Sequence, residues 1–478
     1  MTIAARARML VTRLRELRVA DRAARAVAAT ITHMDFAENI FRAYDIRGIT
    51  PDELGPEVAH AVGRVFADFL EPGKVGVGRD MRTDSAELAE AVKAGLIDQG
   101  REVVDIGLVT SDMIYFAVGE WDLAGGAMIT ASHNPGKYDG IKLTREQVKP
   151  VGEETGLLDL RNAIRDDRYE AAKPGGSSQD HDMMDDWVAH ALDFAGGTLA
   201  PLRIGIDCGN GMAGLVVPVL DAKTDLEISA LYLELDGTFP NHVANPLIDE
   251  NVADLVKLVT RENLQAGIAF DGDGDRAFMI DENGTKVSGS LLGALLAEKF
   301  LAENPGATIL YNAICSRVVP ETIEANGGTA IRTRVGHSFI KAEMRKHNGV
   351  FAAEHSGHFY FRDNFNADSG LIAAVSALGV MTKTGRPLSE LVAPFEKYAN
   401  SGEINSEVAD TTAVLDKLRD EFSDGDQDEL DGLTVNYPDW WFNVRLSNTE
   451  PVVRLNVEAA ASDLCDEKTA EILSVIRA

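Results

Sequence analysis

Cysteine is scarce in this chain, and its three copies, Cys208, Cys315 and Cys465, lie far apart in the sequence. No Cys-x-x-Cys pair is present and no histidine stands at ligand spacing beside them, so neither a zinc site nor a disulfide framework is indicated. No apolar run approaches the roughly 18 residues that a membrane-spanning helix requires. These absences favour a protein of the reducing cytoplasm.

Basic side chains are also few relative to acidic ones. The chain has 46 Lys and Arg residues against 76 Asp and Glu residues, a formal net charge of −30, and a sequence pI near 4.7. Because nonspecific attraction to phosphate backbones and anionic lipids needs clustered Lys and Arg, we expect no nucleic-acid or membrane partner. An anionic small substrate is compatible with this charge, provided that its site concentrates Arg and Lys locally.

The length of 478 residues is several times that of a typical domain and predicts three or four compact units. Hydrophobic residues make up 45% and charged residues 26%, which is ordinary for a globular protein. Residues 1–33 differ from the rest because they are rich in Arg and Ala. They lack the serines of a transit peptide and the apolar centre of a secretory signal. We therefore expect 1–33 to be a dispensable basic extension, with Met34 as the translation start.

Three short β-rich runs begin in the same way, each ending in a polar turn and leading into a helix-length segment: Val75–Gly78, Leu202–Ile206 and Thr308–Tyr311. Their spacing predicts three related α/β units in series, with parallel or mixed sheets flanked by helices. The Pro-, Gly- and Ser-rich segment Lys173–Ser178 predicts a linker between the first two. From about Ser401 the pattern changes and predicts a smaller α+β domain.

The segment Thr130–Pro135 follows a strand-like run and places Ser132 in a polar loop, where its hydroxyl can point into a site. An unreactive turn is the alternative. A serine hydrolase fits less well, because Ser132 lacks the flanking glycines of a nucleophile elbow and the adjacent His133 points away from it.

The segment Asp271–Arg276 places three carboxylates on alternate residues with glycines between them, so that Asp271, Asp273 and Asp275 can converge on one hard cation. A calcium EF-hand is the competing interpretation, since Glu282 stands at its twelfth position. Arg276 occupies the sixth position, where an EF-hand needs glycine, and both flanks have the pattern of strands. The sequence therefore favours Mg²⁺ over Ca²⁺, and a solvated acidic loop without metal is the remaining alternative.

Two further loops have binding chemistry. Glu354–His358 combines carboxylate, imidazole and hydroxyl groups, which suits recognition of sugar hydroxyls, although a polar turn is an equal alternative. Arg445–Pro451, with Arg454 in the following strand, combines backbone N–H groups, hydroxyls and guanidinium groups that can bind phosphate. The alternative is an ordinary hairpin turn with a surface arginine.

The segment Gly209–Gly214 matches the Gly-x-Gly-x-x-Gly pattern of dinucleotide-binding loops, with Glu234 or Asp236 near the place of a ribose-binding acid. It suggests an NAD-dependent dehydrogenase as a distant alternative. That interpretation explains neither the triple-aspartate loop nor the phosphate-binding loop.

The segment Phe41–Gly48 and the four loops, in this order, resemble the α-D-phosphohexomutases from about residue 37 to the C-terminus. Within that family the Glu-His-Ser-Gly-His form of the third loop is similar to that of bacterial phosphomannomutases and of dual phosphomannomutase/phosphoglucomutases. The resemblance implies an α/β fold of four domains around a central cleft, three related mixed-sheet domains and a smaller C-terminal α+β domain. We place these domains at residues 34–178, 179–287, 288–399 and 400–478.

The resemblance also implies a role for each matching residue. Ser132 would be the phosphorylated nucleophile. The ligands of Mg²⁺ would be the phosphoserine oxygen of Ser132 and the side chains of Asp271, Asp273 and Asp275. The residues that bind the substrate, its sugar hydroxyls or its phosphates, would be Glu354, Ser356, His358, Arg276, Arg445, Ser447, Asn448, Thr449 and Arg454. The other catalytic candidates, for positioning or proton transfer, are Tyr44, Arg47, His133, Lys142 and His337.

On this resemblance the protein would be an isomerase that interconverts mannose 6-phosphate and mannose 1-phosphate through a hexose 1,6-bisphosphate, which is also its activator. A phosphoglucomutase or dual-specificity mutase of the same mechanism is the alternative. We expect a phosphosugar as its partner and a monomer or weak dimer. One position departs from the family, because Ile314 stands where many members have lysine. Its contact with the sugar or phosphate would be either missing or supplied by Arg334 or Lys341, which leaves the choice between mannose and glucose open.

Overall fold

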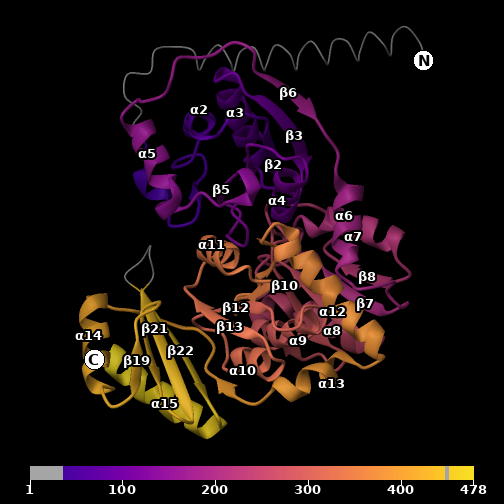
Figure 1. Cartoon of the computed structure of the whole chain (residues 1–478), viewed down its shortest axis with the longest axis vertical. Helices are drawn as coiled ribbons and strands as arrows, with labels where there is room; N and C mark the ends of the chain where they lie inside the picture. The colour runs from indigo at the N-terminus through magenta and orange to yellow at the C-terminus, as the bar shows by residue number, and fades with distance from the viewer. Residues whose placement is uncertain (1–35, 447–451) are drawn as a thin grey trace.

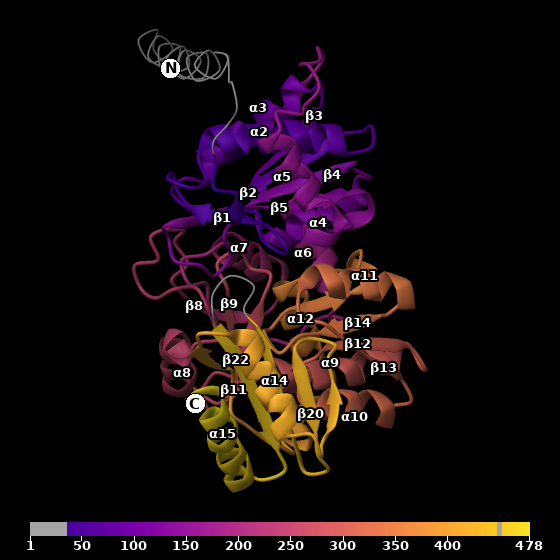
Figure 2. The same ribbon diagram turned by 90° about the vertical axis from the view of Figure 1, so that its left-hand side faces the viewer.

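The computed structural model describes residues 36–446 and 452–478. Four sheets define four domains (Figures 1 and 2). Domain 1 lies at one end of the molecule, and domain 4 lies beside domain 3 at the other end. The basic extension 1–33 and Met34 lie outside the described residues.

The sheet of domain 1 has the strand order β1-β5-β4-β2-β3-β6. Its strands are β1 (Ile46–Ile49), β2 (Val75–Arg79), β3 (Glu102–Leu108), β4 (Gly125–Ile129), β5 (Tyr138–Arg145) and β6 (Ser177–Asp180). Its helices are α2 (Pro56–Phe69), α3 (Ser85–Asp98), α4 (Ser111–Glu120) and α5 (Leu157–Arg165). The linker prediction is wrong at its end, because Ser177 and Ser178 pair in parallel with β3. The boundary drawn at residue 178 therefore falls inside a strand, since the open edge of β3 offers backbone partners to this polar segment.

Domain 2 has the strand order β11-β10-β9-β7-β8. Its strands are β7 (Arg203–Asp207), β8 (Glu227–Leu231), β9 (Ala266–Phe270), β10 (Ala277–Asp281) and β11 (Lys286–Val287), and its helices are α6 (Met184–Asp193), α7 (Ala213–Lys223) and α8 (Asp249–Glu262). Helix α8 buries Val252, Leu255, Leu258 and Val259 on one face. This helical spacing of apolar residues seats the helix on the sheet.

Domain 3 has the strand order β13-β12-β14-β15-β16. Its strands are β12 (Thr308–Asn312), β13 (Thr329–Thr333), β14 (Phe351–Ala353), β15 (Phe359–Phe361) and β16 (Ala367–Asp368). Its helices are α9 (Gly289–Glu303), α10 (Val318–Ala325), α11 (His337–His347), α12 (Gly370–Thr384) and α13 (Leu388–Val392). The hydroxyls of Ser288 and Ser369 accept hydrogen bonds from backbone N–H groups in the first turns of α9 and α12, which fixes where both helices begin.

The three sheets repeat one plan. In each, three parallel strands are followed by an antiparallel strand: β3-β2-β4 then β5, β8-β7-β9 then β10, and β13-β12-β14 then β15. The prediction of three related α/β domains with mixed sheets is confirmed. The three runs that carried the prediction became β2, β7 and β12, the central strands of the parallel part.

Domain 4 is a smaller α+β unit, as predicted. Its strands are β17 (Ala399–Asn400), β18 (Ile404–Glu407), β19 (Asp426–Asp428), β20 (Leu433–Asn436), β21 (Trp440–Leu446) and β22 (Val452–Ala459), with α14 (Thr411–Glu421) and α15 (Ser462–Ile476). The boundary placed between residues 399 and 400 falls inside β17, because both of its residues pair with β22. It has its own core, formed around Phe442, Val453 and Leu455. A larger core joins domains 2 and 3 and includes α4 of domain 1. Domain 4 is thus packed separately from the body that carries the three repeated sheets.

Short 3-10 helices occupy several connections: Glu38–Ile40, Glu146–Val148, Glu153–Thr155, Arg362–Asn364 and Ala393–Phe395. Among the described residues, no helix combines the length and the apolar character needed to cross a bilayer.

Candidate active site

The three repeated sheets present their loops at equivalent places. In each sheet the last parallel strand turns back into the antiparallel strand, and this turn carries a predicted motif: 130–137 between β4 and β5, 271–276 between β9 and β10, and 354–358 between β14 and β15. The loops touch one another. The N–H of Ala277 donates to the carbonyl of Gly357 at 3.3 Å, and a Cβ on Gly272 would lie 2.3 Å from the carbonyl oxygen of Ser132. Three motifs that lie far apart in the sequence therefore form one site.

Ser132 is buried and has a left-handed backbone, with φ of 50°, which residues other than glycine rarely adopt. Its hydroxyl donates to Oδ2 of Asp271 at 2.7 Å and accepts from Nη2 of Arg276 at 3.2 Å. The oxygen also lies 3.2 Å from Nδ1 of His133, so the expectation that His133 points away from Ser132 is wrong. This hydroxyl sits between a carboxylate and a guanidinium, an arrangement suited to a nucleophile that receives an anionic group.

The three aspartates of the second loop fit a metal ion. Each is at most 1% exposed, and they offer carboxylate oxygens within 4.8 Å of one another. Within the described parts of the chain, Oδ1 of Asp273 and Oδ1 of Asp275 have no hydrogen-bond partner. Buried oxygens of this kind are costly unless a cation meets them, and carboxylates are the ligands that Mg²⁺ prefers. The flanking elements are strands, so the EF-hand alternative is wrong.

Lys142 on β5 contacts the same aspartates. Its Nζ donates to Oδ2 of Asp273 at 2.7 Å and to Oδ2 of Asp275 at 2.6 Å. Burial opposes its charge, but Asp273 and Asp275 raise the pKa of Lys142 well above its ordinary value. Burial, then the charges of Asp275 and Asp273, raise the pKa of Asp271 to about 7. A further cation bound by Asp271 would favour its ionised form.

Two more predicted residues surround the serine. Arg47 on β1 donates to Oδ1 of Asn134 at 2.8 Å and forms an ion pair with Asp45. Asn134 belongs to the loop of residues 130–137, here called the serine loop. Nδ1 of His133 accepts a hydrogen bond from Arg276. Burial and the charges of Arg276 and Arg47 hold the pKa of His133 well below its ordinary value. His133 is therefore a neutral acceptor beside the reactive hydroxyl.

The third loop, Glu354–His358, adjoins the loop Asp271–Arg276, here called the metal loop, through His358. Its Nε2 lies 3.4 Å from Oδ1 of Asp275, and its Nδ1 lies 3.1 Å from the Ser356 hydroxyl. Burial opposes the charged imidazole, but Asp275 raises the pKa of His358. Glu354 is buried, and Oε2 accepts from Nδ2 of Asn312 at 3.0 Å. The carboxylate predicted to hold sugar hydroxyls is thus already held in place by its own domain.

Tyr44 and His337 lie together at the junction of domains 1 and 3. Their rings are 5.5 Å apart, and the Tyr44 hydroxyl donates to the carbonyl of Val335 at 3.0 Å. Burial, then the charges of Lys341 and Lys142, hold the pKa of His337 well below its ordinary value. His337 can therefore accept a proton only weakly, which favours a positioning role.

Arg445 on β21 and Arg454 on β22 face each other as cross-strand partners. Like charges in this position repel, and Glu403 lies between them, accepting from Arg445 and, at 3.2 Å, from Nη1 of Arg454. Burial opposes its charge, but Arg445 and Arg454 lower the pKa of Glu403. The other predicted phosphate ligands, Ser447, Asn448 and Thr449, lie outside the described residues.

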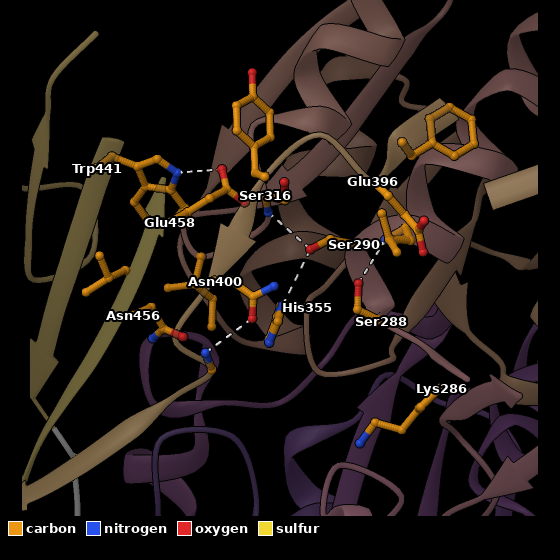
Figure 3. Close-up of a pocket in the computed structure, with 16 residues that line it drawn as sticks. Lys286, Ser288, Ser290, Ser316, His355, Glu396, Asn400, Trp441, Asn456 and Glu458 are labelled. Atoms are coloured by element: carbon orange, nitrogen blue, oxygen red, sulfur yellow. Dashed lines mark hydrogen bonds between the residues drawn. The ribbon is translucent and has the colours of Figure 1, made fainter. Parts of the chain in front are cut away.

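A cavity of about 310 Å³ lies between domains 3 and 4 beside the third loop (Figure 3). Ile314, the departure from the family pattern, lines it together with His355 and Trp441. The proposed substitutes for a lysine at this position are engaged elsewhere. Lys341 is 2.6 Å from Oδ1 of the buried Asp368, and Arg334 is 3.1 Å from Oε1 of Glu154. The expectation that one of them replaces the missing lysine is therefore not supported.

The glycines of Gly209–Gly214 serve packing. A Cβ on Gly211 would lie 2.7 Å from the carbonyl of Gly272, and one on Gly214 would lie 2.2 Å from the carbonyl of Leu233. Asp236 accepts from the N–H and hydroxyl of Thr238 at 2.9 Å and 2.7 Å. The loop Gly209–Gly214 packs against the backbone of the metal loop. This close packing explains its Gly-x-Gly-x-x-Gly pattern without a bound dinucleotide.

Sequence reasoning missed Arg82, which follows β2 and is 3% exposed. Its guanidinium binds the backbone of the serine loop, including the carbonyl of Ser132 at 2.6 Å. The available signal was its place after a buried strand, at the edge of the sheet where the other loops meet.

Comparisons with known proteins agree with this geometry. Family models of phosphoglucomutase/phosphomannomutase match the chain as alpha/beta/alpha domain I at residues 38–167, domain II at 185–284, domain III at 288–398 and the C-terminal domain at 403–474. The chain belongs to the phosphoglucomutase/phosphomannomutase family.

Relatives in this family cover almost the whole chain. "Phosphohexose mutases" of Xanthomonas campestris pv. campestris (strain B100) is 39% identical over 442 residues, 91% of this chain and 99% of the relative. A phosphomannomutase of Escherichia coli is 37% identical over 451 residues, 91% of this chain and 99% of the relative. The crystal structure of a phosphoglucomutase/phosphomannomutase family protein from Burkholderia thailandensis superposes with a TM-score of 0.85 at 31% identity, covering 93% of this chain and 98% of that one. The enzyme is an isomerase of the phosphohexomutase type.

Proposed function

We propose that this phosphohexomutase is a phosphomannomutase that interconverts mannose 6-phosphate and mannose 1-phosphate through a phosphorylated Ser132. The observation that carries the proposal is the Ser132 hydroxyl, which donates to Asp271 at 2.7 Å within a buried group of three carboxylates. The phosphomannomutases among the relatives support mannose as the sugar. A phosphoglucomutase or dual-specificity mutase of the same mechanism is the alternative.

The residues around Ser132 divide the remaining work. Asp271, Asp273 and Asp275, with an oxygen of the serine phosphate, would hold Mg²⁺, which when bound neutralises charge on the transferred phosphoryl group. Arg276 donates toward the Ser132 oxygen and would stabilise the same charge. Lys142 stays protonated because its two aspartate partners raise its pKa, so it would donate a proton and would not act as a base.

The phosphoryl group would pass from Ser132 to O1 of mannose 6-phosphate, giving the 1,6-bisphosphate. The bisphosphate would then turn end over end, and Ser132 would take back the 6-phosphoryl group. Arg445 and Arg454 would bind whichever phosphate is not reacting, and Glu354, Ser356 and His358 would hold the sugar. We expect the enzyme to act in the cytoplasm as a monomer or weak dimer.

Phosphorus NMR tests the proposal directly. The enzyme, primed with a hexose 1,6-bisphosphate, is given mannose 6-phosphate, glucose 6-phosphate and glucosamine 6-phosphate in turn, with and without EDTA. We expect fastest turnover of the mannose ester, loss of turnover in EDTA, and loss of several orders of magnitude in Ser132→Ala. Ser474→Ala, on the exposed face of α15, is the matched control. A fully active Ser132→Ala variant would show that the mechanism does not use a phosphoserine at this position. Production of NADH from a sugar would favour the NAD-dependent dehydrogenase instead.

A further inference from the structure

Arg82 holds the backbone of the serine loop. Its Nη2 donates to the carbonyl oxygens of Ser132 and Asn134 at 2.6 Å and 2.7 Å, and its Nη1 donates to those of Pro135 and Tyr138 at 3.1 Å and 2.9 Å. One guanidinium thus binds three carbonyl groups of the loop between β4 and β5 and a fourth on Tyr138, the first residue of β5. Because a guanidinium is planar and its donors have a fixed geometry, these bonds define the path of the loop.

The Arg82 side chain is itself held in place by hydrogen bonds to Asp80. Its Nε donates to Oδ2 of Asp80 at 3.1 Å, and the backbone N–H of Arg82 donates to Oδ1 of Asp80 at 2.9 Å. The Ser85 hydroxyl lies 2.6 Å from Oδ1 of Asp80 and 2.7 Å from Oδ2 of Asp139. All four residues are at most 3% exposed. The loop therefore rests on a buried chain of one guanidinium, two carboxyl groups and one hydroxyl.

A count of protons fixes the state of this chain. A serine hydroxyl has a single proton to donate, yet it lies at full hydrogen-bond distance from two carboxyl groups. One of the two carboxyl groups must therefore donate to the serine oxygen, and so must itself carry a proton. Asp80 accepts from Arg82 twice and from Ser85. Among the described residues, the one backbone N–H that donates to Asp139 is that of Gly140, at 2.8 Å. The ionised group is then Asp80, and the protonated group is Asp139.

We propose that Arg82 is the positioning residue of the reactive serine loop, and that a neutral, proton-donating Asp139 supports it through Ser85 and an ionised Asp80. The charged groups that face Asp139 agree with this assignment. Asp80 and Arg82 face it from the turn after β2, and the neighbouring residue of β1 is Gly48, which carries no charge. Burial raises the pKa of both carboxyl groups. At Asp80 the charge of Arg82 is the largest opposing influence, whereas at Asp139 the charge of Asp80 adds to burial and raises the pKa to about 8.

The support matters because the backbone of Ser132 is strained. Its φ of 50° costs on the order of 1–3 kcal/mol and persists only where the surroundings enforce it. Arg82 supplies this enforcement by binding the carbonyl of Ser132 itself. It also faces domain 2, with its guanidinium carbon 5.1 Å from the ring centre of Phe239. Arg82 thus sets the serine in a fixed place relative to the metal loop of that domain.

Two substitutions test the positioning role, which rests on the proposed function of Ser132. Arg82→Lys keeps the charge but cannot span four carbonyl groups, and we expect kcat to fall about 100-fold with KM unchanged, since small misplacements of reacting groups have this effect. Arg101→Lys is the matched control, because Arg101 also binds carbonyl groups of domain 1, those of Ala67, Leu70 and Glu71. Both variants should melt at lower temperature, and only Arg82→Lys should lose kcat. Unchanged kcat in Arg82→Lys would overturn the role.

The proton count has its own test, which does not depend on Ser132. In Asp139→Asn the amide can donate to Ser85 as the protonated acid does, so we expect a Tm no lower than that of the wild type and nearly unchanged kcat. The pKa of Asp139 is raised from 3.8 to about 8 on folding, so the wild type should lose stability as pH rises between about pH 4 and about pH 8, and Asp139→Asn should lose less Tm over that range. Asp80→Asn, which leaves Arg82 without its counter-charge, should lose both Tm and kcat. An Asp139→Asn variant that melts well below the wild type would refute the assignment, whatever Ser132→Ala shows.

Discussion

Replacing Lys142 by methionine should make the stability of the enzyme depend on Mg²⁺. Lys142 places its ammonium group 2.7 Å and 2.6 Å from carboxylates of Asp273 and Asp275, and its side chain is 9% exposed. Methionine fills a similar volume without charge, so three buried carboxylates would retain Arg276 as their neighbouring cation. Removing one partner of a buried ion pair costs about 3–5 kcal/mol. For domains of this size that loss corresponds to a fall of roughly 6–20 °C in Tm.

Mg²⁺ should recover much of this loss. Since Lys142 and the metal compete for the same carboxylates, the ion should stabilise the Lys142→Met variant more than the wild type. Ligand at about 100 times its Kd adds about 2.7 kcal/mol of stability, and tighter binding adds more. Thermal denaturation followed by circular dichroism, in EDTA and in excess Mg²⁺, measures both effects.

Lys93→Met is the matched control for this experiment. Lys93 also lies between two carboxylates in domain 1, Glu90 and Asp105, and its side chain is 10% exposed. Its variant should lose some stability but gain no more from Mg²⁺ than the wild type does. Equal Tm values for Lys142→Met and wild type in EDTA, or equal rescue of both variants by Mg²⁺, would refute the reasoning.

Three further outcomes follow from the structure. Gly211→Ala should weaken Mg²⁺-dependent turnover, because its Cβ would lie 2.7 Å from the carbonyl oxygen of Gly272. Asp236→Ala should leave mutase kinetics unchanged. Unchanged turnover in Gly211→Ala together with loss of turnover in Asp236→Ala would restore the dinucleotide interpretation. Arg317→Ala should raise KM more than it lowers kcat, since Arg317 of domain 3 donates to the carbonyl of Tyr437 in domain 4 at 2.8 Å; unaltered KM would contradict this. Native protein should resist thiol reagents until unfolded, because burial raises the pKa of its thiols: Cys208, Cys315 and Cys465.

The repeated architecture was predictable because each unit opens with a buried strand and a polar turn. These signals are local, so β2, β7 and β12 are recognisable without tertiary information. The end of the linker was not, because Ser177 and Ser178 have turn-forming side chains and become a strand only by pairing with β3. Edge pairing of a polar segment depends on a neighbouring strand that local sequence does not reveal.

The candidate site was predictable where one loop contained the whole chemical group. The three aspartates of the metal loop are every second residue of one short segment, so a tight turn is enough to bring their carboxylates together. The roles of Arg82 and Asp139 were not predictable, because each role depends on contacts with residues that lie far away in the sequence and are brought close by the fold. An arginine that binds carbonyl groups has the same sequence appearance as one on the surface.

The left-handed backbone at Ser132 restricts which hydroxyl amino acid can stand there. Threonine has the same functional group, but a β-branched side chain is an outlier at positive φ. A threonine in place of Ser132 should therefore be disfavoured on conformational grounds alone. The backbone geometry thus selects against the one alternative alcohol of comparable size that chemistry would permit.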